Sequence, residues 1–220
     1  MGENDSAKDR DAGWNALVAL VDADGGERHD FVAAMRARQA ATSDLADTVH
    51  LLCALHGRHP GLIDHAAAHC RDERIASWLR DAAATFAGER AFLARLTAAA
   101  GPIPSTPGQA ECEAAVAVQR HALDMLAQSD RNGTAVGAVF ALLLDWRAIR
   151  GVLDAAATRA GLMPPPMPLP DVEEIARAAT LAPPPPSVER AMCFGAQQLL
   201  AQHRALWDLA EARHCARDRA

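Results

Sequence analysis

Histidines and carboxylates at helical spacing are the residues of this chain best suited to chemistry. The stretch HLLCALHGRHPGLIDHAAAHC, from His50 to Cys70, holds five of the nine histidines and two of the five cysteines. Imidazole and carboxylate groups that converge inside a helical bundle can bind a divalent metal such as iron, manganese or zinc. Whether they converge depends on which face of each helix carries them.

A di-iron site of the ferritin type needs two Glu-x-x-His pairs and two further glutamates, all pointing into the bundle. This chain has two pairs of related spacing, Asp47-x-x-His50 and Glu211-x-x-His214. The apolar face of the helix that carries the first pair runs through Leu52. At about 100° per residue, Asp47 and His50 point away from that face, toward water or a second contact. The first pair is therefore not predicted to be an inward-facing ligand set.

The same helical phase predicts a set of inward-facing polar residues. One acid lies in line with Phe86 and Leu93, and another interrupts the apolar run FALLLDW. One histidine shares the face of Leu52, and two more, eleven residues apart, share a stripe of the last helix. Brought together, these side chains could hold a divalent metal or a small ligand. This predicted inward cluster consists of Glu89, Asp145, His56, His203 and His214.

A structural interpretation of the same residues stands beside this one. Buried carboxylates are destabilising unless they are paired or hydrogen-bonded. Arg90, Arg147 and Arg150 lie close to the two acids in sequence. Each acid would then form an ion pair, and each histidine would be a hydrogen-bonded core residue. The sequence pattern leaves both interpretations open.

His65 and His69 form a separate, weaker candidate. Residues four apart share one face of a helix, so the two imidazoles can chelate Zn²⁺, Ni²⁺ or Cu²⁺ at two positions. His59 and Cys70 are the nearest residues that could add a ligand. No Glu stands between the two histidines in an H-E-x-x-H arrangement, so no metalloprotease is indicated. The alternative is an exposed flank of the helix.

Signatures of nucleophilic catalysis and nucleotide binding are absent from the sequence. It contains no G-x-S-x-G, P-loop, G-x-G-x-x-G or kinase motif. Cys53 lies three residues from both His50 and His56, but no third group is placed to orient a histidine base. Whether the protein is an enzyme stays undecided, and the pattern favours a protein that is not one.

Charge and composition exclude several classes of protein. The net charge is −6 and the 22 basic residues are interspersed with 28 acidic ones, so no basic stripe for nucleic acid is predicted. No apolar run reaches the 18 or so residues of a transmembrane helix. The N-terminus MGENDSAKDRDAG lacks the apolar core of a signal peptide. An odd number of scattered cysteines indicates no disulfide framework, and we expect a cytoplasmic protein.

The composition predicts an all-α multi-helix bundle. The chain is rich in Ala, contains no Tyr and has few β-branched residues, which favours helix over sheet. Residues 1–12 are expected to be disordered, and residues 13–161 to form the bundle, with ferritin-like up-down packing as one possibility. Residues 162–186 read as a proline-rich linker with one short helix. Residues 187–217 are expected to form a C-terminal helix, tethered by that linker, which packs on the bundle.

Capping signals place several helix ends. Thr106 and Gln109 predict a capping box, as do Asp171 and Glu174, and Ser187 is expected to cap the last helix. The segment TAVGAVFALLLDW is apolar on every side, so its helix should lie at the centre of the bundle. Prolines in LMPPPMPLP and APPPPS exclude helix from the segments on either side of DVEEIARAAT.

Two segments resemble those of a known group of proteins. GPIPSTPGQAECEA and DWRAIRGVLDAAATRAG are similar to stretches in uncharacterised helical proteins of alphaproteobacteria, and the likeness covers roughly the middle third of the chain. Such a family has no assigned chemistry, so the resemblance implies no catalytic residues. The order and length of the predicted helices also resemble those of ferritin-like proteins, at the level of fold alone.

The function expected from these patterns is binding or self-association. Apolar faces on several helices and the tethered last helix suggest a homodimer, which could form by exchange of that helix between two copies. Two alternatives remain: a ferritin-like metal-binding bundle, and a sensor or carrier with a small-molecule pocket between helices.

Overall fold

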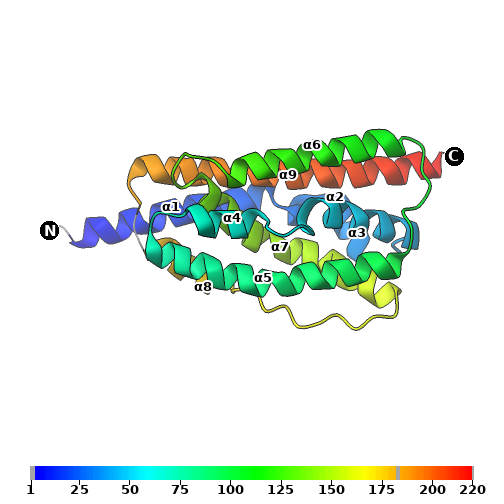
Figure 1. The fold of residues 1–220 in the computed structure, drawn as a ribbon, viewed down its shortest axis with the longest axis horizontal. Coiled ribbons are helices and arrows are strands. Elements are labelled where there is room, and N and C mark those ends of the chain that lie inside the picture. Colours follow the sequence, from blue (N-terminus) through cyan, green and yellow to red (C-terminus); the bar gives the residue numbers. More distant parts are fainter. Residues whose placement is uncertain (1–2, 182–183, 220) are drawn as a thin grey trace.

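The computed structural model describes residues 3–181 and 184–219, which are helical throughout apart from turns and connecting segments (Figure 1). Side chains are described from Gly13 onward. In chain order the elements are α1 (Glu3–Asp24), the short 3₁₀ helix η1 (Gly26–Arg28), α2 (Asp30–Arg36), α3 (Thr42–His56), α4 (Leu62–His69), α5 (Glu73–Ala100), α6 (Gln109–Ala127), α7 (Thr134–Arg159), α8 (Val172–Thr180) and α9 (Pro186–Asp218).

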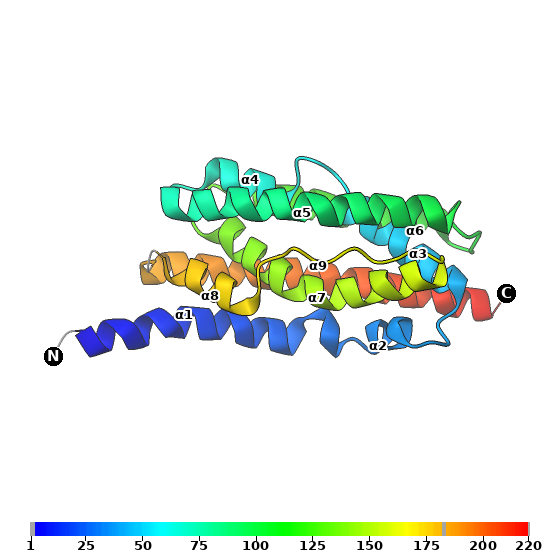
Figure 2. The ribbon, with the colours of Figure 1, turned by 90° about the horizontal axis from the view of Figure 1, so that it is seen from below.

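Helix α7 forms the centre of the bundle. Viewed from two directions, it runs between α5 on one side and α1 with α2 on the other, and α9 lies alongside it (Figures 1 and 2). Its side chains are buried around most of its circumference, from Val139 to Ala157. This burial agrees with the sequence, because a helix that is apolar on every side must be surrounded by other elements.

The closest contact in the bundle joins α7 to α9, which run in the same direction. A Cβ atom on Gly137 would lie 2.0 Å from the carbonyl oxygen of Met192, and one on Gly195 would lie 1.9 Å from that of Thr134. No side chain can occupy either position at this helix separation. These two glycines therefore set the distance between the two helices.

Parallel neighbours require a long return connection, and the proline-rich segment supplies it. After α7 the chain runs back along that helix to α8, which lies at the end of the bundle where α7 begins (Figure 2). Arg147 of α7 donates a hydrogen bond to the carbonyl of Pro170, and Arg150 donates one to the carbonyl of Pro165. Two arginines of the central helix thus hold the return segment in place, since proline carbonyls still accept hydrogen bonds.

The N-terminal end of the chain departs from the sequence prediction. Residues 3–12, which were expected to be disordered, form the first turns of α1. Acidic residues near the start of this helix favour it, because they interact with the positive end of the helix dipole. Residues 1 and 2, and residues 182 and 183 of the predicted linker, lie outside the described residues.

Two of the three predicted caps are wrong. Helix α6 begins at Gln109 after Gly108, whose left-handed φ of 78° turns the chain into the helix, so Thr106 is not a cap. Helix α9 begins at Pro186, where proline supplies a preset φ, so Ser187 lies within the first turn. The capping box of Asp171 with Glu174 at the start of α8 is confirmed.

Within the described ranges, no helix is long and apolar enough to cross a membrane.

Candidate functional site

A line of hydrogen bonds joins three buried side chains from three helices. Asp145 of α7 accepts a hydrogen bond from Nδ1 of His203 of α9, with 2.6 Å between Oδ2 and Nδ1. The Nε2 atoms of His203 and of His56, the last residue of α3, are 3.0 Å apart. All three side chains are at least 90% buried. We call this arrangement the Asp145–His203–His56 line.

The carboxylate determines where the protons of the line lie. Because Asp145 accepts from Nδ1 of His203, that nitrogen carries a hydrogen, and a neutral His203 must then accept at Nε2. His56 accordingly donates from its own Nε2. Burial, reinforced by the nearby His203, lowers the pKa of His56 well below its ordinary value. His56 is therefore neutral at physiological pH.

Two glycines allow the backbone to approach the carboxylate. The N–H of Gly26 donates to the second oxygen of Asp145 at 2.7 Å. A Cβ on Gly25 would lie 2.8 Å from that oxygen, and one on Gly26 would lie 3.1 Å from Nε1 of Trp207. The Gly-Gly pair directly follows Asp24, the last residue of α1. The pair also makes room for Asp145, which no spacing rule reveals.

Aromatic side chains pack around His56, at one end of the line. The ring of His56 meets that of Trp146 edge-on, with centroids 5.4 Å apart, and Phe86 packs against Trp146 at 4.6 Å. The indole N–H of Trp207 is buried and has no hydrogen-bond partner among the described residues. The line therefore lies in an apolar setting in which an additional charge would be strongly destabilising.

Glu89 does not join the histidines through any hydrogen bond. Its carboxylate accepts from the indole of Trp146 at 2.9 Å and from Arg150 at 2.7 Å. Arg150 was one of the three arginines that the structural interpretation named. The structure thus brings Asp145, His56 and His203 together, while Glu89 forms a satisfied ion pair beside them.

A second buried polar region joins α3 to the end of α9. Arg213 forms two hydrogen bonds with the carboxylate of Asp47, at 2.8 and 2.9 Å. Arg217 donates to Asp47 and to Asp44. Burial opposes the charge of each arginine, but the aspartates outweigh it and raise both arginine pKa values. We call Asp44, Asp47, Arg213 and Arg217 the arginine network.

The arginine network accounts for the positions of Asp47 and His214. Asp47, predicted to point away from the apolar face of α3 toward water or a second contact, is 1% exposed because α9 makes that second contact. His214, predicted to be in the inward cluster, instead bonds Asp44 at 2.9 Å with 39% of its side chain exposed. It therefore does not reach the Asp145–His203–His56 line.

Another set of metal-ligand types lies at the surface, among the residues that the structure describes. His29, Asp208 and Glu211 bring ligand atoms within 4.8 Å of one another. Nδ1 of His29 accepts a hydrogen bond from the N–H of Phe31, so Nε2 carries the proton and donates to Asp208. A metal at Nε2 would require the opposite tautomer, so we interpret this set as a helix cap with an exposed hydrogen bond to Asp208.

The surface pair His65 and His69 lies on α4, as the spacing indicates. Their ring centroids are 6.5 Å apart, and Nδ1 of His69 donates to the carbonyl of His65. Chelation by this pair stays a prediction. Three of the thiols are disfavoured as nucleophiles, because burial raises the pKa of Cys70, of Cys112 and of Cys193.

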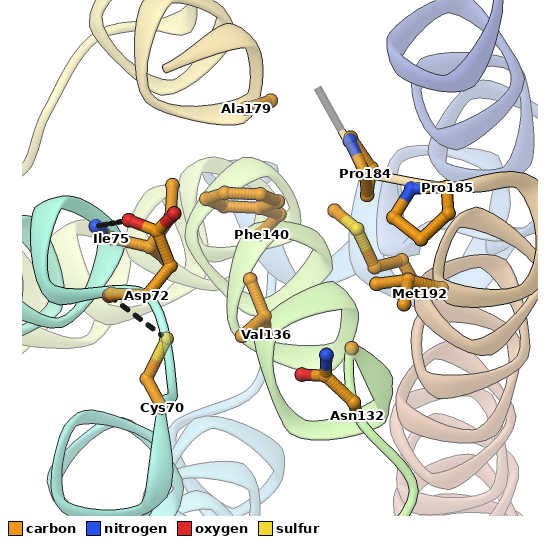
Figure 3. A pocket seen from close by; sticks show the side chains of 12 residues that line it. Cys70, Asp72, Ile75, Asn132, Val136, Phe140, Ala179, Pro184, Pro185 and Met192 are labelled. Atoms are coloured by element: carbon orange, nitrogen blue, oxygen red, sulfur yellow. Dashed lines mark hydrogen bonds between the residues drawn. The ribbon is translucent and has the colours of Figure 1, made fainter. Parts of the chain in front are cut away.

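A cavity of about 170 Å³ opens near the start of α7 (Figure 3). Phe140 and Val136 of α7 lie at its centre, with Ile75 of α5 on one side and Met192 of α9 on the other. Polar groups lie at its rim, where the thiol of Cys70 bonds to the carbonyl of Asp72. Four stretches of the chain build this cavity, including Ala179 of α8 and the prolines that precede α9.

A groove of about 300 Å³ lies between α6 and α9. Two large apolar side chains are exposed there, Met125 of α6 and Phe194 of α9. None of the residues that line it is charged: Ala122, Met125, Leu126, Ser129, Thr134, Phe194, Gln198 and Gln202.

Comparison with known proteins places the chain in a family. The model described as "Family of unknown function (DUF6975)" matches residues 21–218, which is nearly the whole chain. The chain belongs to this family. No curated protein and no solved structure matches it. Membership of a family without assigned chemistry agrees with the resemblance seen in the sequence, whereas the alphaproteobacterial and ferritin-like likenesses stay predictions.

Proposed function

We propose that this family member acts by binding, and that its ligand is a small apolar molecule held in the cavity between α5, α7, α8 and α9. The observation that carries the proposal is the cavity itself. Its volume of about 170 Å³ is close to that of an engineered cavity, about 150 Å³, that binds benzene. An apolar cavity of this size therefore fits a single ring or a short branched chain.

The lining restricts the chemistry of the ligand further. The carboxylate of Asp72 already accepts the backbone N–H groups of Arg74 and Ile75, so it is occupied as a helix cap. The Asn132 side chain at the rim offers both a donor and an acceptor. A neutral ring with one hydroxyl or carbonyl group matches this lining better than a charged ligand does.

Binding of indole, p-cresol and fluorobenzene tests the proposal. We expect millimolar or tighter binding of at least one probe to the full chain, observed by ligand-detected NMR. Val136→Phe should fill the cavity and abolish binding, whereas Val118→Phe is the matched control because Val118 lies on α6 and is 70% exposed. Equal binding by both variants, or no binding of any probe, would contradict the proposal.

Self-association is the second candidate, and the uncharged groove between α6 and α9 favours it. Two copies that each carry a net charge of −6 repel one another least where neither presents a charge. We expect a mass that rises with concentration in sedimentation experiments, and a monomer for Met125→Glu. Met163→Glu is the control, since Met163 is 85% exposed on the return segment. A constant monomeric mass for the wild type would exclude this candidate.

A di-iron bundle receives no support from the geometry, since Glu89 is engaged by Trp146 and Arg150. The cytoplasmic location stays a prediction.

A further inference from the structure

The two histidines of the buried line face each other with their Nε2 atoms 3.0 Å apart. The lone pair of an imidazole nitrogen can bind either a proton or a metal cation. His203 is oriented from behind by a carboxylate bonded to its other ring nitrogen. Histidines that ligate metals have this same support, which fixes the ring and leaves Nε2 free to coordinate.

We propose that His56 and His203 together bind one monovalent cation of the Cu(I) class, held between their Nε2 atoms. The proposal is independent of the apolar cavity and of the groove between α6 and α9. Asp145 would lie in the second sphere, with its own orientation fixed by the backbone N–H of Gly26.

The number of ligands selects this class of ion. Among the described residues, no third His, Cys, Asp or Glu atom lies within 4.8 Å of both nitrogen atoms. Zinc in proteins takes four ligands in a tetrahedron, and octahedral ions need more. A d¹⁰ monovalent ion is satisfied by two opposed nitrogen donors, and imidazole is a suitable ligand for copper.

The charge of the site also favours a monovalent ion. The line contains one carboxylate, that of Asp145, and two imidazoles. The neighbouring acid Glu89 is neutralised by Arg150 at 2.7 Å. A single positive charge therefore balances the line, whereas a divalent ion would leave a net positive charge in an apolar core. His56 remains neutral on binding if its proton moves from Nε2 to Nδ1.

The rings must separate slightly to admit the ion. Two opposed bonds of about 2 Å would place the nitrogens roughly 4 Å apart, compared with the present 3.0 Å. His56 has room to withdraw, because a void of about 30 Å³ lies against it, lined also by Leu55, Phe86 and Leu142. It is also the last residue of α3, where a small shift disturbs no following helical turn.

The test is titration of the full-length chain, without a His-tag and under anaerobic conditions, with Cu(I) supplied as its acetonitrile complex. Bicinchoninate as a competing chelator keeps the ion from single thiols. We expect one equivalent of bound Cu(I), and X-ray absorption spectra that show two nitrogen neighbours and no sulfur. Zn²⁺ in the same assay should not displace the ion.

Two variants and a control locate the ion. His56→Leu should weaken binding more than about 100-fold, and Asp145→Asn, which keeps both ligands, by about 10- to 100-fold. His121→Leu is the same substitution at an exposed histidine of α6 and should leave affinity unchanged. Absence of binding, a sulfur ligand, or equal effects of His56→Leu and His121→Leu would overturn the proposal. If His56→Leu does not fold, the absorption spectrum of the wild type decides alone.

Discussion

The Asp145–His203–His56 line and the arginine network are both buried and both join α3 to α9, yet they consist of different kinds of side chain. The network contains two aspartates and two arginines joined by ion pairs. The line contains one carboxylate and two imidazoles joined end to end by hydrogen bonds. One region is thus held by paired charges, and the other by hydrogen bonds between rings that can also ligate a cation.

This difference has a physical consequence for where function can lie. A network of paired charges resists change, because removal of one member leaves the other buried charges with fewer partners. In the line, the hydrogen bond between the two imidazoles can open without leaving an unpaired charge. We therefore expect the network to contribute stability and the line to contribute response, and variants of each should separate the two roles.

The largest expected effect is in the network. Arg213→Met removes two buried hydrogen bonds to Asp47 and leaves that carboxylate with Arg217 alone, and a hydrogen bond to a charged group contributes about 1.5–3 kcal/mol. Urea unfolding at pH 7.5 measures the change. Arg204→Met on the same helix is the control: its pair with Asp24 is about half exposed and should contribute less than about 1 kcal/mol. Similar losses in both variants would refute the assignment of stability to the network.

In the line, Asp145→Asn should have the next largest effect. The carboxylate accepts from both Gly26 and His203, whereas an amide can accept only one of these and turns its NH₂ toward the other donor. One unsatisfied buried donor destabilises by about 1–3 kcal/mol. The matched control is Asp124→Asn, at a side chain that is 41% exposed. Unfolding curves that coincide for these two variants would show that Asp145 is not bound as described.

Helical phase located the line better than the network. His56, His203 and Asp145 were all predicted to face inward, because each shares a face with apolar residues three or four positions away. Asp47 was predicted to point away from the apolar face of its helix. That face is not unique, since α3 is covered by α9 on a second side, and phase within one helix cannot reveal a second neighbour.

Partners from distant parts of the chain could not be predicted. Glu89 and Arg150 are 61 residues apart, and Asp47 and Arg213 are 166 apart, so no local spacing connects them. The role of Gly26 depends on a backbone N–H, which every residue except proline possesses and which leaves no mark in the sequence. Thr106 looked like a helix cap, but its hydroxyl accepts from Arg217 of the last helix.

Acid should weaken the line and spare the network. Because the pKa of His56 is lowered in the folded protein, the unfolded chain takes up a proton first as the pH falls below about 6.5. The contribution of His56 is therefore complete above that pH and is lost below it, by up to about 1.4 kcal/mol per pH unit.

Urea unfolding at intervals from pH 7.5 to 5.5 measures this dependence. The wild type should lose stability more steeply than His56→Leu, which has no imidazole to protonate at that position. Arg213→Met, although less stable throughout, should keep the slope of the wild type. A His56→Leu slope as steep as that of the wild type would mean that other histidines cause the loss.

His214 gives the smallest effect and the sharpest test of the comparison. Helical phase places it in the same stripe as His203, eleven residues earlier, so sequence alone assigns the two equal importance. In the structure the His214 side chain, which bonds Asp44, is 39% exposed. Arg217 also bonds Asp44, so Asp44 keeps a partner when the imidazole is removed. His214→Gln should therefore change the free energy of unfolding by about 0.5 kcal/mol or less at pH 7.5. A loss as large as that of Asp145→Asn would show that the rim of the network is as tightly bound as the line, and the contrast between a buried and a half-exposed histidine would fail.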